Sequence, residues 1–202
     1  MKEKLRTFFN EMADKWDEIQ DISYEKLEQL LSRLPIPRGS VILDVGSGTG
    51  VLIPFLRKLF MPSLIVEMDI AERMLAIARR KFGSDGILYI WGDAESYRFD
   101  INFDAIICYS SFPHFEDKEK AIKNLVNFLD GRGIFAIVHT LGREDIRRIH
   151  SMNEITKDDI LPSAEEISLL FKKNGLEILE SIDDEDKYLV VGVKVENPRL
   201  NL

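Results

Sequence analysis

Three glycines at alternate positions follow an acid at the end of a short apolar run. The segment reads Asp44-Val-Gly46-Ser47-Gly48-Thr-Gly50. Glycine lets the backbone turn sharply and approach a ligand closely, and ligands of open parallel sheets bind beyond the carboxyl ends of the strands. The spacing therefore predicts a cofactor-binding loop, with a ligand-free strand-to-helix turn as the alternative. A dinucleotide-binding loop would have glycine where this chain has Val51, which disfavours NAD.

Two further acids follow the next two apolar runs. Asp69 lies 69 − 50 = 19 residues after Gly50, and an acid at about this distance suits the hydroxyls of a ribose. Capping of the helix that starts near Ala71 is its alternative role. Asp93 follows the third apolar run, where a carboxylate can accept a hydrogen bond from the exocyclic amine of a purine; an ordinary polar loop residue is the alternative.

The chain has three histidines, His114, His139 and His150. His114 follows the fourth expected strand and His139 ends the fifth, so both are expected at the ligand edge of the sheet. A histidine there can act as a general base near neutral pH, and these two are the candidate catalytic residues. For His150, on a following helix, a structural role is favoured. A metal or substrate-anion site made by all three is a minority alternative, and no metal is predicted.

Alternating strands and helices must position these side chains. Apolar runs bounded by turn residues predict five buried strands, at Val41–Val45, Leu64–Val66, Ile87–Trp91, Phe103–Cys108 and Ile134–His139. Helical stripes separate them, which indicates a parallel sheet with right-handed crossovers. Two last runs, Leu176–Ile182 and Tyr188–Val195, are separated only by a short acidic stretch and are expected to pair as an antiparallel hairpin.

Helical patterns flank this core. Apolar residues spaced by three and four predict one amphipathic helix over Leu5–Ile19 and a second over Tyr24–Leu34. Ser163 and Glu166 have the spacing of a capping box, which predicts a helix start just before the hairpin. The end of the chain, Glu196–Leu202, is expected to fray.

Taken in order, these segments resemble the class I S-adenosylmethionine (SAM)-dependent methyltransferase family. The matching stretches are VILDVGSGTG, VEMDIAERMLAIARRKF, GDAESYRFDINFDAIICYSSFPHF and LDGRGIFAIVHT. The resemblance implies an α/β Rossmann-like fold with a seven-stranded sheet in the order 3-2-1-4-5-7-6 and strand seven antiparallel. It also implies one methyltransferase domain over residues 1–202, with a helical lid at 1–35, a SAM-binding core at 40–140, and acceptor-side helices with the hairpin at 141–195.

The resemblance also implies roles for individual residues. The methionine end of SAM would be held by the loop residues Asp44, Gly46, Ser47, Gly48 and Gly50. Asp69 would hold the ribose, with Ile70 and Met74 following it, while Asp93 and Ala94 would hold the adenine. Cys108, Tyr109 and Ser110 would pass near the methionine and sulfonium, and Trp16 belongs to the lid segment. Glu67 stands where many relatives have glycine or a small residue, so Glu67 and Asp69 are both candidates for the ribose contact.

Charge and cysteine content narrow the function classes. The net charge of −8 favours a small-molecule acceptor over nucleic acid, although Arg143, Arg147 and Arg148 could form a local basic patch. The single cysteine, Cys108, cannot form an internal disulfide or a cysteine zinc site, which points to the cytoplasm. No apolar run is long enough for a signal peptide or a membrane span, so we expect a soluble protein.

The leading prediction is therefore an enzyme that transfers a methyl group from SAM to a small molecule and leaves S-adenosylhomocysteine (SAH). A SAM-binding sensor or assembly partner without transferase activity is the alternative from a different class. The signature of DNA and glutamine amino-methyltransferases is absent, since its place reads Ser110-Ser-Phe-Pro113-His114. The charged segment at 141–160, where the family usually builds its acceptor pocket, suits either a polar acceptor or a solvated helix; the acceptor and the oligomeric state are not predicted.

Overall fold

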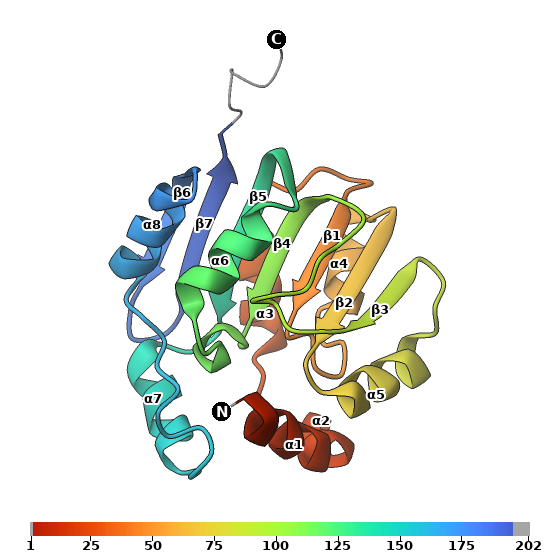
Figure 1. The fold of residues 1–202 in the computed structure, drawn as a ribbon, viewed down its shortest axis with the longest axis vertical. Helices are drawn as coiled ribbons and strands as arrows, with labels where there is room; N and C mark the ends of the chain where they lie inside the picture. The colour runs from red at the N-terminus through yellow and green to blue at the C-terminus, as the bar shows by residue number, and fades with distance from the viewer. Residues whose placement is uncertain (1, 196–202) are drawn as a thin grey trace.

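The computed structural model describes residues 2–195 and contains one seven-stranded sheet (Figure 1). Its strands run in the order β3-β2-β1-β4-β5-β7-β6, as predicted. The strands are β1 (Val41–Val45), β2 (Leu64–Asp69), β3 (Ile87–Trp91), β4 (Phe103–Tyr109), β5 (Leu129–His139), β6 (Leu176–Asp183) and β7 (Tyr188–Lys194).

The central strands are parallel, and only β7 runs against its neighbours. β1 pairs in parallel with both β2 and β4, whereas β7 lies antiparallel between β5 and β6. The central strands are buried on both faces, which explains why they read as near-continuous apolar runs. The predicted hairpin at the end of the chain is confirmed.

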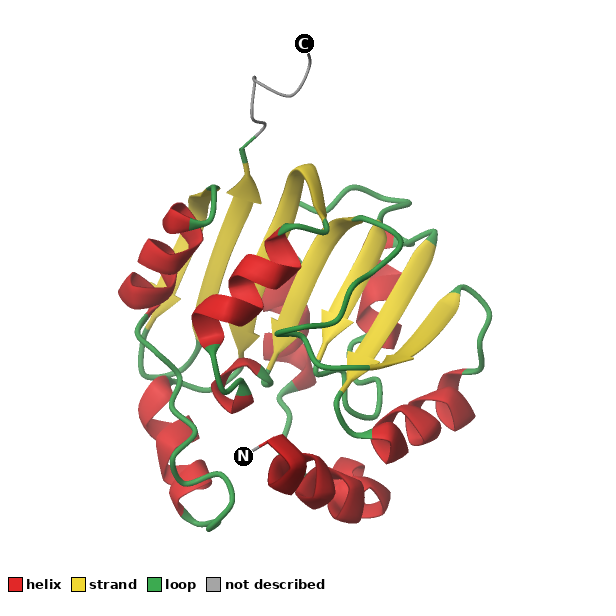
Figure 2. Cartoon of the chain, in the orientation of Figure 1, coloured by secondary structure: helices red, strands yellow, loops and turns green. Residues whose placement is uncertain are grey.

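Helices cover both faces of the sheet (Figure 2). On one face, α6 (Lys118–Val126) and α8 (Ala164–Lys173) pack Ile122 and Phe171 into the larger core cluster. On the other, α3 (Tyr24–Leu31) and α4 (Ile53–Phe60) pack Leu27 and Leu56 into the second cluster. The predicted capping box is present at the start of α8, where Ser163 and Glu166 satisfy each other's backbone donors.

The remaining helices lie at the carboxyl edge of the parallel strands (Figure 1). They are α1 (Lys2–Met12), the 3-10 turn η1 (Ala13–Lys15), α2 (Trp16–Ile19), α5 (Glu72–Phe82), the 3-10 turn η2 (Phe112–His114) and α7 (Arg143–Ser151). This is the edge at which open α/β sheets bind ligands.

The first helix and β5 differ from the expected elements. The first predicted helix is interrupted at Ala13–Lys15, where the chain tightens into a 3-10 turn with Ala13 buried. β5 begins at Leu129 rather than Ile134, because Leu129 already pairs with Phe103 of β4, ahead of a register shift before Ile134. The predicted frayed end, Glu196–Leu202, lies outside the described residues. Among those residues, every helix is too short or too polar to span a bilayer.

Candidate active site

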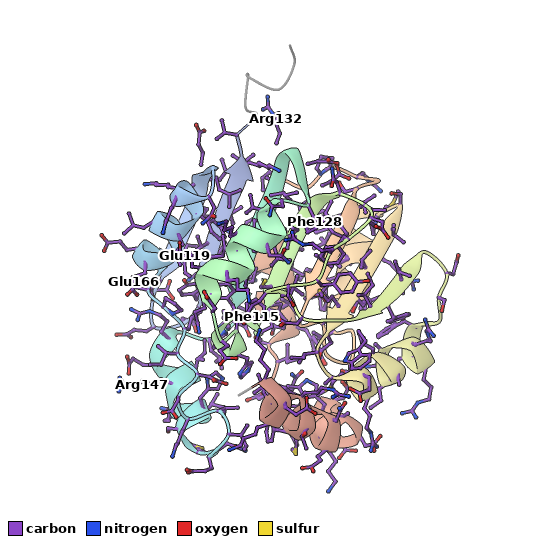
Figure 3. The ribbon with its side chains drawn as sticks, viewed as in Figure 1. Phe115, Glu119, Phe128, Arg132, Arg147 and Glu166 are labelled. Carbon is purple, nitrogen blue, oxygen red and sulfur yellow. The ribbon has the colours of Figure 1, made fainter. Side chains whose placement is uncertain are left out.

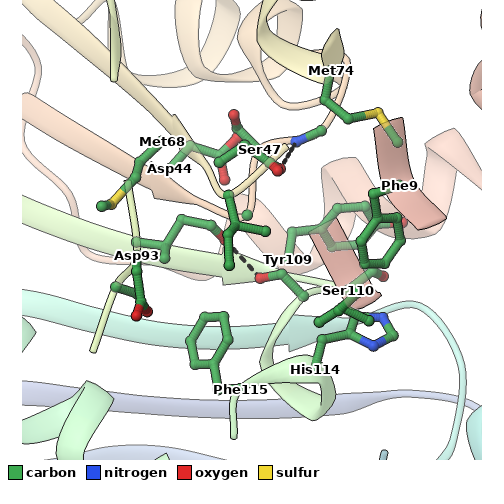
Figure 4. Close-up of a pocket in the computed structure, with 18 of the residues that line it drawn as sticks. Phe9, Asp44, Ser47, Met68, Met74, Asp93, Tyr109, Ser110, His114 and Phe115 are labelled. Carbon is green, nitrogen blue, oxygen red and sulfur yellow. Dashed lines mark hydrogen bonds between the residues drawn. The ribbon is translucent and has the colours of Figure 1, made fainter. Parts of the chain in front are cut away.

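A cavity opens at the carboxyl edge of β1, β2 and β4, beneath α1 and α2 (Figure 4). It encloses about 980 Å³ of space when its opening to solvent is included, which is room for a drug-sized ligand. All predicted cofactor residues except Gly50 and Cys108 line it: Trp16, Asp44, Gly46, Ser47, Gly48, Asp69, Ile70, Met74, Asp93, Ala94, Tyr109 and Ser110. Side chains from five separate stretches of the chain therefore converge on one space.

The glycine loop is held against the sheet through its backbone. The amide groups of Gly46 and Ser47 both donate to Met68 O, at 2.7 and 3.0 Å. Gly46 has φ +69°, and a Cβ added there would lie 2.4 Å from Ser111 Cβ. The Ser111 hydroxyl in turn donates to Val45 O at 2.6 Å. Only glycine fits this close passage between the ends of β1 and β4.

Asp69 joins the loop to the start of the next helix. Its carboxylate accepts from Gly48 N at 2.8 Å and from Ala71 N at 2.7 Å. Burial raises the pKa of Asp69 to about 6, and these backbone donors oppose the rise. Each oxygen accepts one of these hydrogen bonds and has capacity for another. The loop-bracing role and the predicted ribose contact are therefore compatible, and Asp69, unlike Glu67, lines the cavity.

Asp44 and Glu67 are neighbours on β1 and β2 below the loop. Asp44 is 1% exposed and Glu67 is 0% exposed. Asp44 Oδ2 and both Glu67 carboxylate oxygens have no hydrogen-bond partner among the described residues. Burial raises the pKa of both carboxyls well above the ordinary range.

Asp93 lies at the opposite end of the cavity from His114 (Figure 4), and Glu95 also lines the cavity. The Lys2 ammonium donates to Asp93 Oδ2 at 2.6 Å and to Glu95 Oε2 at 2.7 Å. Glu95 Oε1 accepts from the backbone of Glu116 and Asp117, at 2.9 and 3.1 Å. Sequence reasoning identified Asp93 but missed Glu95 and Lys2, because nothing in the local pattern shows that the first turn of α1 reaches this loop.

The N-terminal helices are fastened to α5 along the cavity rim. Arg6 makes two hydrogen bonds to the Glu72 carboxylate, at 2.6 and 3.0 Å, and Asn10 donates to Glu72 at 2.9 Å. Asp17 pairs with Lys81 at 2.7 Å. Beneath these polar contacts lies a small apolar cluster: Phe9, Ala13, Trp16, Ala71, Met74 and Ile77.

His114 lines the cavity and is fixed by an acid distant in sequence. Its Nδ1 lies 2.7 Å from Asp159 Oδ2, and Asp159 O lies 2.8 Å from His150 Nδ1. The two imidazole rings are 4.8 Å apart, and Phe9 meets the His114 ring edge-on at 5.2 Å. The Lys118 ammonium donates to Pro113 O and Phe115 O at 3.0 and 2.9 Å, which braces the turn that carries His114.

His139 ends β5 at the carboxyl edge of the sheet, as expected, but it does not line the cavity. The alternation of side chains along β5 turns it away, toward Tyr188 of the paired strand β7. It is 2% exposed, and burial lowers its pKa to about 3. The same alternation places Cys108 in the core while Tyr109 lines the cavity. Gly50 faces Ile53 and Phe82 instead of the cavity.

The structure gives no support to a three-histidine metal site or to a basic patch on α7. The described residues contain no group of three or more histidine, cysteine, aspartate or glutamate side chains arranged to hold a metal. The arginines of α7 do not gather into one patch, since Arg143 pairs with Asp183 and Arg148 with Asp145. Arg147 points outward from α7 (Figure 3).

Sequence comparison places this core among methyltransferases. Residues 43–137 match the family described as "Methyltransferase domain". A malonyl-[acyl-carrier protein] O-methyltransferase of Bacillus anthracis is 28% identical over 162 residues, which cover 78% of this chain and 60% of that protein. The matched stretch therefore spans 60% or less of the length of two such curated relatives.

Solved structures share the whole fold at low identity. One chain of a complex between the Haloferax volcanii Trm112 methyltransferase activator and a methyltransferase superposes with a TM-score of 0.81 at 20% identity, covering 93% of this chain and 98% of that one. Magnesium protoporphyrin IX methyltransferase of Synechocystis with bound SAH superposes with a TM-score of 0.70 at 18% identity, covering 96% and 100%.

Proposed function

We propose that this chain, a member of the class I SAM-dependent methyltransferase family, binds SAM in the cavity and transfers its methyl group to a small-molecule acceptor. The observation that carries the proposal is the convergence of the glycine loop, Asp69 and Asp93 on one cavity at the ligand edge of the sheet. The net charge of −8 supports a small molecule over nucleic acid as acceptor. The buried free thiol of Cys108 fits a reducing compartment, and we propose the cytoplasm.

The residues present fit SAM. Asp44 and Ser47 line the cavity. The buried Asp44 carboxyl has no cation paired with it among the described residues, and the positively charged groups of SAM would supply one. Asp44 and the loop would hold the methionine end, Asp69 the ribose, and Asp93 with the Ala94 backbone the adenine. Residues 1–35 would act as a lid, since Phe9 and Trp16 already line the cavity.

SAM supplies a methyl group that is already activated by the sulfonium, so the protein needs mainly to align the acceptor and exclude water. An acceptor that must lose a proton also needs a base. His114 is the candidate, because it lines the cavity and Asp159 holds its Nδ1. With Nδ1 carrying the proton, Nε2 is the basic nitrogen. Asp159 is then a positioning residue, and Asp159→Asn is expected to lower turnover without changing SAM affinity.

Calorimetric titration of the purified protein with SAM and SAH tests the central claim, with Asp69→Ala beside the wild type. Micromolar binding that the variant loses supports the cofactor site and justifies an acceptor screen with labelled SAM. A folded wild-type protein that binds neither ligand, alone or with candidate acceptors present, contradicts the proposal.

A SAM-binding sensor or assembly partner is the alternative function. Conversion of SAM to SAH by the protein in the presence of cell extract separates the two, because only a transferase consumes SAM when an acceptor is supplied. Tight SAM binding without turnover in any extract would favour the sensor. An intact His114–Asp159 contact favours the transferase, since a sensor has no use for an oriented base in the cavity.

A further inference from the structure

Two carboxyl groups lie side by side beneath the cofactor loop. Asp44 on β1 and Glu67 on β2 are paired in the parallel register, so their side chains project from the same face of the sheet. That face also carries the second core cluster, which includes Ile42 and Ile65, two positions before the two carboxyls on the same strands. Three of their four carboxylate oxygens are buried and have no hydrogen-bond partner among residues 2–195.

Their other neighbours do not compensate a double negative charge. The titratable groups facing the pair are the Asp69 carboxyl, the Tyr89 phenol on β3 and the Cys108 thiol on β4, all neutral or acidic. The Ser47 hydroxyl lies against Glu67 without a hydrogen bond of normal geometry. No salt bridge joins a described cation to either carboxyl. Two adjacent buried carboxyls without a compensating cation repel each other when both are ionised, which favours a proton on the pair.

The cavity offers one route to compensating charge. Asp44 lines the cavity, whereas Glu67 lies directly behind it. The proposed ligand is cationic at its methionine end, where it carries an ammonium group and the sulfonium. A cation beside Asp44 favours the ionised pair.

We propose that Asp44 and Glu67 form an electrostatically coupled carboxyl pair that holds a proton in the free protein and releases it when SAM binds, with Glu67 setting the charge of the cofactor subsite. This inference rests on the proposed function, since it takes SAM as the ligand. Glu67 thereby acts through Asp44 as a positioning residue and does not itself touch the cofactor. The affinity for SAM follows the ionised fraction of the pair. It therefore rises with pH below the pKa of the pair, by up to about tenfold per pH unit for one linked proton.

Titration calorimetry in two buffers of different ionisation enthalpy counts the protons released as SAM binds. The wild type is expected to release close to one proton near neutral pH. Glu67→Gln keeps the shape of the side chain and leaves Asp44 as the only carboxyl of the pair, so it is expected to release fewer protons than the wild type and to bind SAM with a weaker pH dependence. Glu180→Gln, on the edge strand β6 and away from the cavity, is the control for loss of a carboxyl and is expected to behave as the wild type.

Infrared spectroscopy of the wild type gives a second measurement that needs no variant. The carbonyl band of a protonated buried carboxyl is expected in the free protein and is expected to weaken when SAM is added. Binding of SAM without proton release, or equal release by Glu67→Gln, overturns the carboxyl pair while leaving the proposed function intact. Failure of the wild type to bind SAM overturns the proposed function instead.

Discussion

The floor and the cover of the cavity are built in different ways. The floor consists of strand ends and the glycine loop, fixed by sheet register and by backbone bonds such as those from Gly46 and Ser47 to Met68. The cover consists of α1 and α2, held to α5 largely by side-chain pairs at the surface, such as Arg6 with Glu72. Backbone-fixed groups keep their geometry, whereas surface ion pairs are weak and screened by salt.

This difference separates two tasks. The groups that would hold a cofactor need fixed positions, and they belong to the floor. The cover must move for a ligand to enter, and its attachments can break without disturbing the sheet. The floor also contains the carboxyls without hydrogen-bond partners, which lower the stability of the folded protein electrostatically. The cover contains ordinary ion pairs instead. Substitutions in the two regions are therefore expected to differ in size and in the property that they change.

The largest expected effect is in the floor, at Gly46. Gly46→Ala would bring its Cβ to 2.4 Å from Ser111 Cβ in a left-handed conformation. We expect a loss of about 3 kcal/mol in the free energy of unfolding, from overpacking together with backbone strain, and a loss of SAM binding. Urea unfolding followed by circular dichroism measures the first, and calorimetry the second.

Gly39→Ala is the matched control. Gly39 also has positive φ, at +84°, but a Cβ there meets nothing within 4 Å. The Gly39→Ala variant should lose only about 1 kcal/mol in the free energy of unfolding, because of its backbone conformation. Its affinity for SAM should be unchanged. Equal losses in the two variants would show that strain alone, and not the close passage at Ser111, matters in the loop.

Glu67→Gln tests the electrostatic cost of the floor. The folded-state pKa of Glu67 is raised above its ordinary value of 4.5, so the folded protein binds its proton more tightly than the unfolded chain. The wild type therefore loses stability as pH rises from about 4.5 toward the folded pKa. The variant does not titrate there, and we expect it to be more stable by about 1 kcal/mol at pH above neutrality. Urea unfolding at acidic and mildly alkaline pH measures this gain, and a gain that is independent of pH would contradict it.

Much of the floor could be predicted from the sequence, because it is local. Glycine spacing and the acids that end β1 and β2 are visible in short windows, and they indicated Asp44, Gly46 and Asp69 as cavity residues. The strand order came from the resemblance to a family and is confirmed. Short stretches of sequence do not show which side chains at a strand end face the cavity. In the structure, the alternation of side chains along the strands buries Cys108 and His139.

The cover and the acceptor side could not be predicted in this way. Lys2 meets Asp93 across 91 positions, and His114 meets Asp159 across 45. Such contacts depend on where whole helices pack, which no local pattern records. The 3-10 turn at Ala13 is a similar case, since the apolar spacing continues through it as in a single helix.

In the cover, Glu72→Gln should lower the affinity for SAM and leave the free energy of unfolding of the whole protein unchanged. Glu72 joins Arg6 and Asn10 of α1 to α5, and these hydrogen bonds lower its pKa to about 2. The pair with Arg6 is exposed, so we expect SAM affinity to fall only roughly twofold to fivefold. Glu3→Gln is the control, because Glu3 pairs with Arg6 inside α1. Because the pKa of Glu72 is lowered in the folded protein, its contribution to holding α1 against α5 is complete above pH 4.5. This contribution is lost as pH falls toward 2.

The smallest expected effect is that of salt on the attachment of the cover in the protein without added SAM. Raising the salt concentration from about 0.05 M to about 0.5 M shortens the screening length severalfold and weakens the ion pairs of α1 and α2, but not the backbone bonds of β1. Amide hydrogen exchange in residues 2–19 should then accelerate while exchange in Val41–Val45 stays constant. If exchange accelerated equally in both segments, the cover and the floor would open as one unit. If exchange stayed constant in both segments, the apolar cluster around Met74, rather than the ion pairs, would hold the cover.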